Sequence, residues 1–271
     1  MSLIVGASTY CYLYDHSLDT SLERLASIGF KQLEIMTCPP HVWTRDLDAK
    51  ARQNLRRKIE SYGLQVFSSQ PGIWPELSLA SPNPGIRGEA VRQMKENIQL
   101  LHDLGGKVLG TMPGTMIGKV GPSKEQALEL ARQSISACAD VAEHLGITLA
   151  IENVPRGFVA TADDVLQLIQ MVGSPAVRAT IDVGNANVIE PPLQALERAK
   201  EYLAMVHLND NDGQFDKLPV GQGTIDFGAI GKKLLDIGYT RPCILEIVIP
   251  GGTDEDFRVS KTALEELGWQ T

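Results

Sequence analysis

The chain has 271 residues, of which 43% are hydrophobic and 21% are charged. This balance is typical of a soluble globular protein and excludes a disordered chain. The 33 acidic residues outnumber the 25 basic ones and give a formal net charge of -8. Nucleic acid is therefore not an expected partner, because an acidic protein offers no broad surface to phosphates.

The cysteines and the N-terminus point to a cellular compartment. Cys11, Cys38, Cys138 and Cys243 lie far apart and form no Cys-x-x-Cys pair, so we expect reduced thiols. The N-terminus lacks a basic stretch before an apolar core, and no run approaches the ~20 apolar residues of a membrane span. We expect a cytoplasmic protein that does not bind a membrane.

The first half of the chain alternates short apolar runs with longer segments of helical period. Strands are predicted at 2–8, 31–36, 64–69 and 107–111, and helices at 18–28, 47–62, 88–104 and 123–145. Glycines such as Gly29 and Gly146 end these helices. The Pro/Gly-rich segment from Gln70 to Gly85 is a long predicted loop, and long loops often carry function.

The second half repeats the same alternation. Strands are predicted at 147–152, 177–182, 203–208 and 243–247, and helices at 162–172, 193–200, 227–237 and 254–267. Eight strand-helix units without a composition break predict a single (β/α)8 TIM barrel with a parallel eight-stranded sheet, one domain over 1–271. A doubly wound open sheet is the alternative, but Gly-x-Gly-x-x-Gly is absent after the first strand.

Four predicted strands, the fifth to the eighth, end in side chains that bind metals: Glu152, Asp182, His207 and Glu246. The catalytic residues of such barrels lie at the carboxyl ends of the strands. Three carboxylates that meet there would repel one another unless a cation lay among them. The set therefore predicts one divalent metal ion, with Mn2+, Mg2+ or Co2+ favoured by the oxygen-rich ligands and Zn2+ as an alternative. Any one of these residues alone would more simply be a helix cap or a core residue.

Other polar and aromatic residues are candidates for the wall of a pocket. Glu34 and Gln70, near the ends of the second and third strands, are predicted to bind substrate hydroxyls or to orient a ligand. Aromatic residues in the early loops could line a sugar site or simply pack: Tyr10, His16, Trp43 and Trp74. The segment 220–227 is either a phosphate site or, more simply, a tight turn in which Asp226 caps the next helix.

The strand-end motifs are familiar together. They are Ile151-Glu152-Asn153, Thr180-Ile-Asp182-Val-Gly184-Asn185, Val206-His207-Leu-Asn-Asp210 and Ile244-Leu-Glu246. Together they resemble the xylose isomerase-like TIM barrel superfamily, which includes sugar isomerases, ketose 3-epimerases, inosose dehydratases and endonuclease IV. The likeness covers nearly the whole chain and is most specific between residues 147 and 247.

The resemblance implies a metal-dependent isomerase or epimerase of a ketose or related polyol, phosphorylated or not. Glu152 and Glu246 would bind the metal and also act as the two catalytic acid/base groups on opposite faces of the sugar. Asn185 and Arg156 would bind substrate. The chain departs from the epimerases at two positions, because Asn185 replaces their histidine and Phe158 replaces their substrate-binding glutamate.

Three alternatives stay open at this point. The first is a metal-dependent dehydratase of the inosose or dehydroshikimate type, and the second is a sugar-binding barrel without catalysis. The third, an AP endonuclease, is disfavoured because Ser68-Ser-Gln70 and Met112-Pro-Gly114 lack the histidines that endonuclease IV uses for further metals. The likeness also allows a homo-oligomer.

Overall fold

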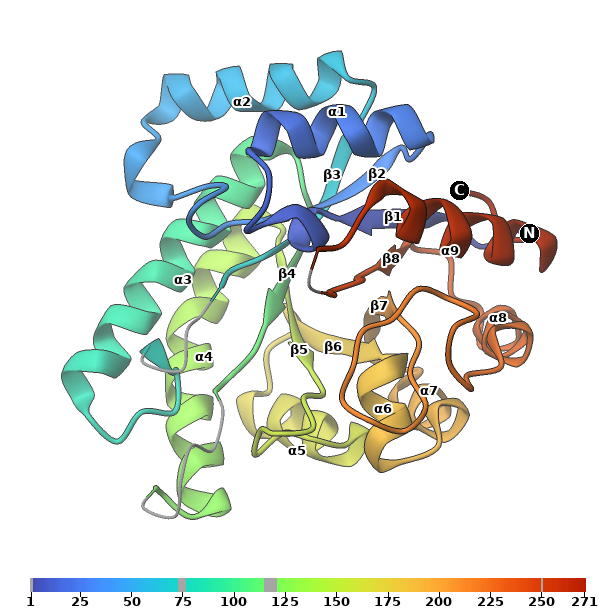
Figure 1. The fold of residues 1–271 in the computed structure, drawn as a ribbon. Coiled ribbons are helices and arrows are strands. Elements are labelled where there is room, and N and C mark those ends of the chain that lie inside the picture. Colours follow the sequence, from blue (N-terminus) through green and yellow to red (C-terminus); the bar gives the residue numbers. More distant parts are fainter. Residues whose placement is uncertain (1, 73–76, 115–120, 250) are drawn as a thin grey trace.

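A computed structural model describes residues 2–72, 77–114, 121–249 and 251–271. Eight parallel strands form a closed barrel in chain order, and the last strand pairs with the first (Figure 1). The strands are β1 Val5–Ser8, β2 Gln32–Met36, β3 Gln65–Gln70, β4 Val108–Thr111, β5 Thr148–Glu152, β6 Val177–Asp182, β7 Leu203–Leu208 and β8 Cys243–Leu245. The predicted (β/α)8 barrel is confirmed.

Helices surround the barrel (Figure 1). They are α1 Leu18–Ile28, α2 Ala49–Ser61, α3 Pro84–Leu104, α4 Lys124–Leu145, α5 Ala162–Val172, α6 Val183–Ile189, α7 Pro192–Ala199, α8 Phe227–Asp236 and α9 Asp254–Glu266. Two short 3-10 helices, η1 Thr9–Tyr12 and η2 Thr44–Asp46, follow β1 and β2. Among the described helices, none is long and apolar enough to cross a membrane.

Local chemistry accounts for the helix ends. Ser123 and Thr161 begin α4 and α5 with reciprocal capping boxes, which satisfy otherwise unpaired backbone N–H groups. Gly29 and Gly146 end α1 and α4 with φ of 107° and 66°, a left-handed conformation that only glycine adopts without strain.

Two helical segments differ from the prediction. Helix α3 begins at Pro84, inside the segment expected to be a loop, because Asn83 caps it and proline loses nothing at a first helical position. Helix α6 was not expected at all. It begins directly after β6, where the Asp182 side chain accepts from the backbone N–H of Asn185 and so acts as a helix cap.

Side-chain alternation along the strands separates an inner and an outer layer of the barrel. In β5, Leu149 and Ile151 pack into the large core against the helices, whereas Ala150 packs with Val108 and Ile244 in a small cluster of barrel residues. Because the side-chain period of a strand is two, Glu152 shares the inner face with Ala150.

A register shift adjusts this alternation between β6 and β7. Ala179 pairs with Leu203, but Thr180 pairs with Met205, so one residue of β7 is passed over. After the shift, Asp182 lies directly beside His207. Such irregularities re-aim side chains next to functional sites, and this one places two candidate ligands side by side.

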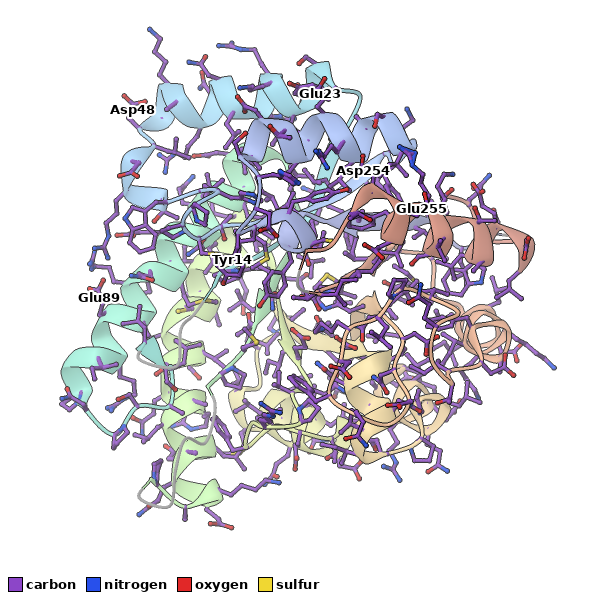
Figure 2. All side chains as sticks on the ribbon, viewed as in Figure 1. Tyr14, Glu23, Asp48, Glu89, Asp254 and Glu255 are labelled. Carbon is purple, nitrogen blue, oxygen red and sulfur yellow. The ribbon has the colours of Figure 1, made fainter. Side chains whose placement is uncertain are left out.

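Acidic side chains also lie on the outer surface of the barrel. Figure 2 shows Glu23, Glu89 and Glu255 on the outer helices, Asp48 directly before α2, and Tyr14 in the segment after η1. Tyr14 is 61% exposed.

Candidate metal centre and active site

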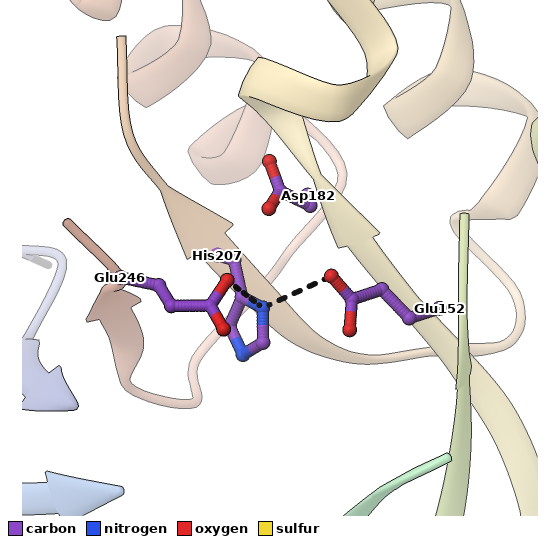
Figure 3. Close-up of side chains that lie close together, drawn as sticks. All are labelled: Glu152, Asp182, His207 and Glu246. Atoms are coloured by element: carbon purple, nitrogen blue, oxygen red, sulfur yellow. Dashed lines mark ion pairs between the residues drawn. The ribbon is translucent and has the colours of Figure 1, made fainter. Parts of the chain in front are cut away.

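The four predicted metal ligands meet at one end of the barrel (Figure 3). Each of Glu152, Asp182, His207 and Glu246 offers one ligand atom, and these atoms lie within 4.8 Å of one another. Glu152 and Asp182 are the last residues of β5 and β6, His207 lies one residue before the end of β7, and Glu246 directly follows β8. All four are buried.

The two ring nitrogens of His207 face different groups. Nδ1 lies 3.2 Å from Glu246 Oε2 and 3.5 Å from Glu152 Oε1. Nε2 points the other way and lies 3.2 Å from Glu34 Oε2. Nδ1 has no partner in hydrogen-bonding geometry among the described residues, so this nitrogen is the one that faces the other ligands.

Asparagines that directly follow the strands hold Asp182 in place. Asn209 Nδ2 donates to both carboxylate oxygens of Asp182 at 3.0 Å. Asn153 pairs with the backbone of Asp182 through its own amide, at 2.8 Å and 3.2 Å. These bonds satisfy a carboxylate that is fully buried, which would otherwise be costly.

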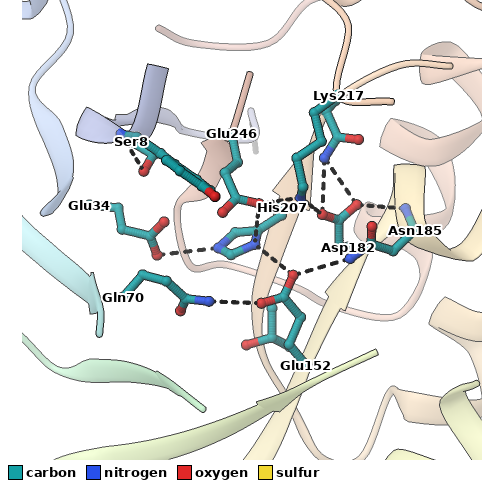
Figure 4. A network of polar contacts seen from close by, with 12 residues as sticks. Ser8, Glu34, Gln70, Glu152, Asp182, Asn185, His207, Lys217 and Glu246 are labelled. Carbon is teal, nitrogen blue, oxygen red and sulfur yellow. Dashed lines mark hydrogen bonds and ion pairs between the residues drawn. The ribbon is translucent and has the colours of Figure 1, made fainter. Parts of the chain in front are cut away.

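Two of the predicted substrate-binding residues contact Glu152 (Figure 4). Gln70 Nε2 donates to Glu152 Oε2 at 3.0 Å, and Asn185 Nδ2 donates to Glu152 Oε1 at 3.2 Å. Gly110 makes room for Gln70, because a Cβ at that position would come within 1.6 Å of Gln70 Oε1. Gln70 and Asn185 therefore orient one carboxylate from two sides.

A lysine that the sequence did not single out completes the cluster. Lys217, in the segment after β7, donates from Nζ to both Asp182 and Glu246 (Figure 4). Its segment is held by Asp210, whose carboxylate accepts from the backbone N–H groups of Asn211, Gly221, Gly223 and Ile225 at 2.9 to 3.2 Å. Since Asp210 takes the glycine N–H groups and Asp226 caps α8, the tight-turn interpretation of 220–227 is confirmed.

Burial and charge act against each other in the cluster. Burial raises the pKa of Glu152 despite the opposing effect of His207. Burial has the same effect on Glu246, but Lys217 and His207 outweigh it and lower the pKa of Glu246 to about 2. For His207, burial is outweighed by Glu34, Glu246 and Glu152, which raise its pKa well above the usual value.

The donor set fits a divalent cation. Four carboxylates, those of Glu34, Glu152, Asp182 and Glu246, lie around or behind His207, and Lys217 supplies a single positive charge among them. The buried Nδ1 of His207, which has no partner in hydrogen-bonding geometry within the described part of the chain, faces the same space as the carboxylate oxygens. Three carboxylates and one imidazole are ligands that divalent metals accept, and the cation would relieve the mutual repulsion.

A pocket of about 310 Å³ opens onto this cluster. Its wall combines ligands and their neighbours with aromatic and apolar side chains: Tyr10, Leu13, Tyr14, Met36, Cys38, Gln70, Gly72, Met112, Glu152, Val154, Asn185, Phe215, Lys217 and Glu246. Burial, followed by the charge of Glu246, raises the pKa of Tyr10 to about 12, so its hydroxyl keeps its proton at neutral pH. Charged side chains thus lie at the bottom of the pocket, and its wall is largely apolar.

The remaining predicted residues lie elsewhere. Glu34 is fully buried behind His207 and is not part of this wall. Arg156 is exposed, with its guanidinium 5.0 Å from the centre of the Phe215 ring. Trp43 lines a separate hollow beside α1 and α2, and Trp74 lies outside the described residues.

Sequence reasoning missed Asn209 as well as Lys217. The signal for Asn209 was available, because it lies two residues after His207 and a strand turns such residues to the same face. No motif or periodic spacing in the sequence indicated Lys217, because it lies in a loop and the path of that loop brings it to the cluster.

Comparison with known proteins places the chain in a family. Residues 22–269 match the family described as xylose isomerase-like TIM barrel, and the chain belongs to it. Among curated proteins it is similar to an uncharacterized protein of Methanocaldococcus jannaschii, 27% identical over 86% of this chain and 80% of the relative.

Sugar epimerases are among the relatives. An L-ribulose 3-epimerase of Mesorhizobium japonicum is 26% identical over 93% of this chain and 82% of its own length. A D-psicose 3-epimerase of Ruminiclostridium cellulolyticum is 26% identical, over 86% and 79% of the two chains. The solved structure of a D-tagatose 3-epimerase-like protein shares the fold, with a TM-score of 0.84, 24% identity and coverage of 99% and 98%.

Proposed function

We propose that this protein is a divalent-metal-dependent epimerase or isomerase that moves a proton beside the carbonyl group of a ketose or related polyol. The observation that carries the proposal is the placement of Glu152 and Glu246, which come from β5 and from the end of β8, reach the same pocket and belong to the same candidate metal centre. The epimerases among the relatives support this reaction class.

The chemistry follows from the residues around the pocket. A cation held by Glu152, Asp182, His207 and Glu246 would polarise the substrate carbonyl and acidify the neighbouring C–H. One glutamate removes that proton from one face, and the other returns a proton to the opposite face, which inverts the carbon. The two exchange roles in the reverse direction.

Other residues in and beside the pocket would contact the substrate. Gln70 and Asn185 present amide groups beside Glu152, where they can bind substrate hydroxyls. Arg156 is not part of the wall, but its guanidinium lies over the ring of Phe215, which is, and from there it would contact the substrate. We do not propose Glu34 as a substrate contact, because it lies behind His207.

The reaction is tested by hydrogen exchange. The protein is loaded with Mn2+, Mg2+, Co2+ or Zn2+ in separate samples and incubated in D2O with ketoses, inososes and their phosphates. After removal of the protein and metal, carbon-bound protons are measured by NMR. We expect exchange beside the carbonyl that is lost with EDTA. A product lighter by one water would instead identify a dehydratase, and tight binding without exchange would identify a sugar-binding protein.

The two-base mechanism is tested by Glu152→Gln and Glu246→Gln. Each should lower kcat by about 10²- to 10⁴-fold, the usual contribution of a positioned acid or base. Glu190→Gln is the matched control, since Glu190 is a largely buried glutamate that holds α5 through the N–H of Ala162 and takes no part in the centre. Near-normal turnover by either active-site variant would refute the mechanism.

A further inference from the structure

A buried carboxylate lies behind the candidate metal centre. Glu34 of β2 and His207 of β7 are both 0% exposed, and Glu34 Oε2 lies 3.2 Å from His207 Nε2. Figure 4 shows Glu34 on the side of His207 away from Glu152 and Asp182. Among the described residues, Glu34 therefore contacts the candidate metal centre through one ligand, His207.

A register shift between β2 and β3 lies at Glu34. Leu33 pairs with Val66, but Glu34 pairs with Ser68, so the two strands shift by one residue at Glu34 and pass over Phe67. The shift brings Ser68 beside Glu34, and Ser68 Oγ donates to the same oxygen, Oε2, at 2.9 Å. An irregularity of this kind redirects a side chain, and here it directs a charged group inward.

We propose that Glu34, supported by Ser68, is a positioning residue that holds His207 with its hydrogen on Nε2 and its Nδ1 lone pair toward the metal. The proposal rests on the metal centre of the proposed function. A neutral imidazole has one N–H and one lone pair, and the acceptor of the N–H decides which nitrogen is free to bind. Partners of this kind fix the orientation of metal-bound histidines.

The environment of Glu34 argues against a role in packing alone. Its second oxygen, Oε1, is buried without a hydrogen-bond partner in the part of the chain that the structure describes. A buried carboxylate is costly unless it is paired, and the partners of Glu34 are Ser68 and His207. A glutamate kept only to fill the barrel would be replaced more cheaply by an apolar side chain.

The first test needs no change at Glu34 or Ser68. The protein is labelled with 15N-histidine and loaded with Zn2+, which is diamagnetic, and the ring nitrogens of the five histidines are observed by long-range 1H–15N NMR. His207 is assigned by loss of its signals in His207→Asn. We expect a proton on Nε2 and a metal-bound Nδ1. A proton on Nδ1, with Nε2 bound to the metal, would overturn the proposal.

The second test measures metal binding by calorimetry and the visible spectrum of bound Co2+. Glu34→Leu should weaken Co2+ binding by about 10- to 100-fold and change the spectrum, as expected for loss of a partner of a ligand. Glu34→Gln keeps an acceptor and should recover part of the affinity. Ser68→Ala should weaken binding by a smaller factor, whereas Ser134→Ala, which removes the buried hydroxyl that bonds Leu79 O, should not change it.

The outcomes separate the two proposals. Wild-type affinity and spectrum in Glu34→Leu would overturn the positioning role and leave the proposed function intact. If the wild-type protein bound neither Zn2+ nor Co2+, the metal-dependent function itself would fail. If Glu34→Leu does not fold, the nitrogen assignment in the wild type and the metal affinity of Ser68→Ala still test the positioning role of Glu34.

Discussion

The two halves of the barrel mouth contribute different chemistry. Strands β5, β6 and β7 and the residue that follows β8 supply all four residues of the candidate metal centre. Strands β2 and β3 supply Glu34 and Gln70, each of which contacts a ligand from the other half. Lys217, after β7, adds a positive charge to the ligand-bearing half. One half thus carries the candidate metal ligands, and the other holds two of those ligands in position, so the centre depends on residues from both halves.

The largest expected effect comes from removing the lysine on the ligand-bearing half. Lys217→Met leaves Asp182 and Glu246 facing each other without their shared cation. Without metal, the free energy of unfolding should fall by roughly 3 to 5 kcal/mol, the usual cost of breaking a buried ion pair. Mn2+ should restore much of this, because ligand binding to the folded state is stabilising.

Urea unfolding with EDTA and with Mn2+ measures this effect. Lys200→Met is the control, since Lys200 pairs with Glu197 on the surface and exposed pairs contribute little. If Lys217→Met lowered the free energy of unfolding equally in EDTA and in Mn2+, Lys217 would not be part of the charge balance of the centre.

A smaller effect is expected from the carboxylate that shapes the loop of Lys217. Asp210→Asn replaces one acceptor oxygen by an NH2 group that faces backbone N–H donors. Stability should fall by about 1 to 3 kcal/mol because buried donors lose their acceptor, and KM should rise as Lys217 moves. Asp212→Asn, an exposed neighbour whose carboxylate bonds Gln214 N, should change neither. Unaltered unfolding in Asp210→Asn would contradict the role of Asp210.

The hydrogen bond between Gln70 and Glu152 is tested by a substitution at Gly110. A methyl group there would displace Gln70, so Gly110→Ala should remove the 3.0 Å bond to Glu152 Oε2 and cost about 1 to 3 kcal/mol through crowding. We expect kcat to fall with it. In a double-mutant cycle, Gly110→Ala should cost much less in a Gln70→Ala background, because the clash is gone. Additive effects would show that Gly110 acts independently of Gln70.

The smallest effect is a stabilisation away from both halves. Gly88 lies in α3 and is exposed, and a methyl group added there would meet no other atom within 4 Å. Gly88→Ala should raise the free energy of unfolding by about 0.5 to 1 kcal/mol through helix propensity and leave kcat unchanged. Thermal unfolding measures the gain. A loss of stability would contradict the prediction, because it would mean that the added methyl group clashes with another atom.

Much of this architecture could be read from the sequence because its signals are local. Hydrophobic period, capping residues and terminal glycines depend on near neighbours, and they located all eight strands and most helices. The errors have the same origin. Pro84 and Gly85 have the composition of a loop, yet Asn83 caps a helix there, and α6 is too short for a periodic pattern to reveal.

The sequence alone determined the (β/α)8 barrel and the four candidate metal ligands, since parallel strands of one barrel end at the same face and ligand side chains at their ends must meet. Only the tertiary structure decided that Glu34 lies behind His207, that Gln70 and Asn185 hold Glu152, and that Lys217 joins the cluster. The first two depend on strand register and on the direction of each side chain, and the third on the path of a loop. These are set by contacts between residues far apart in the chain, which local periodicity does not record.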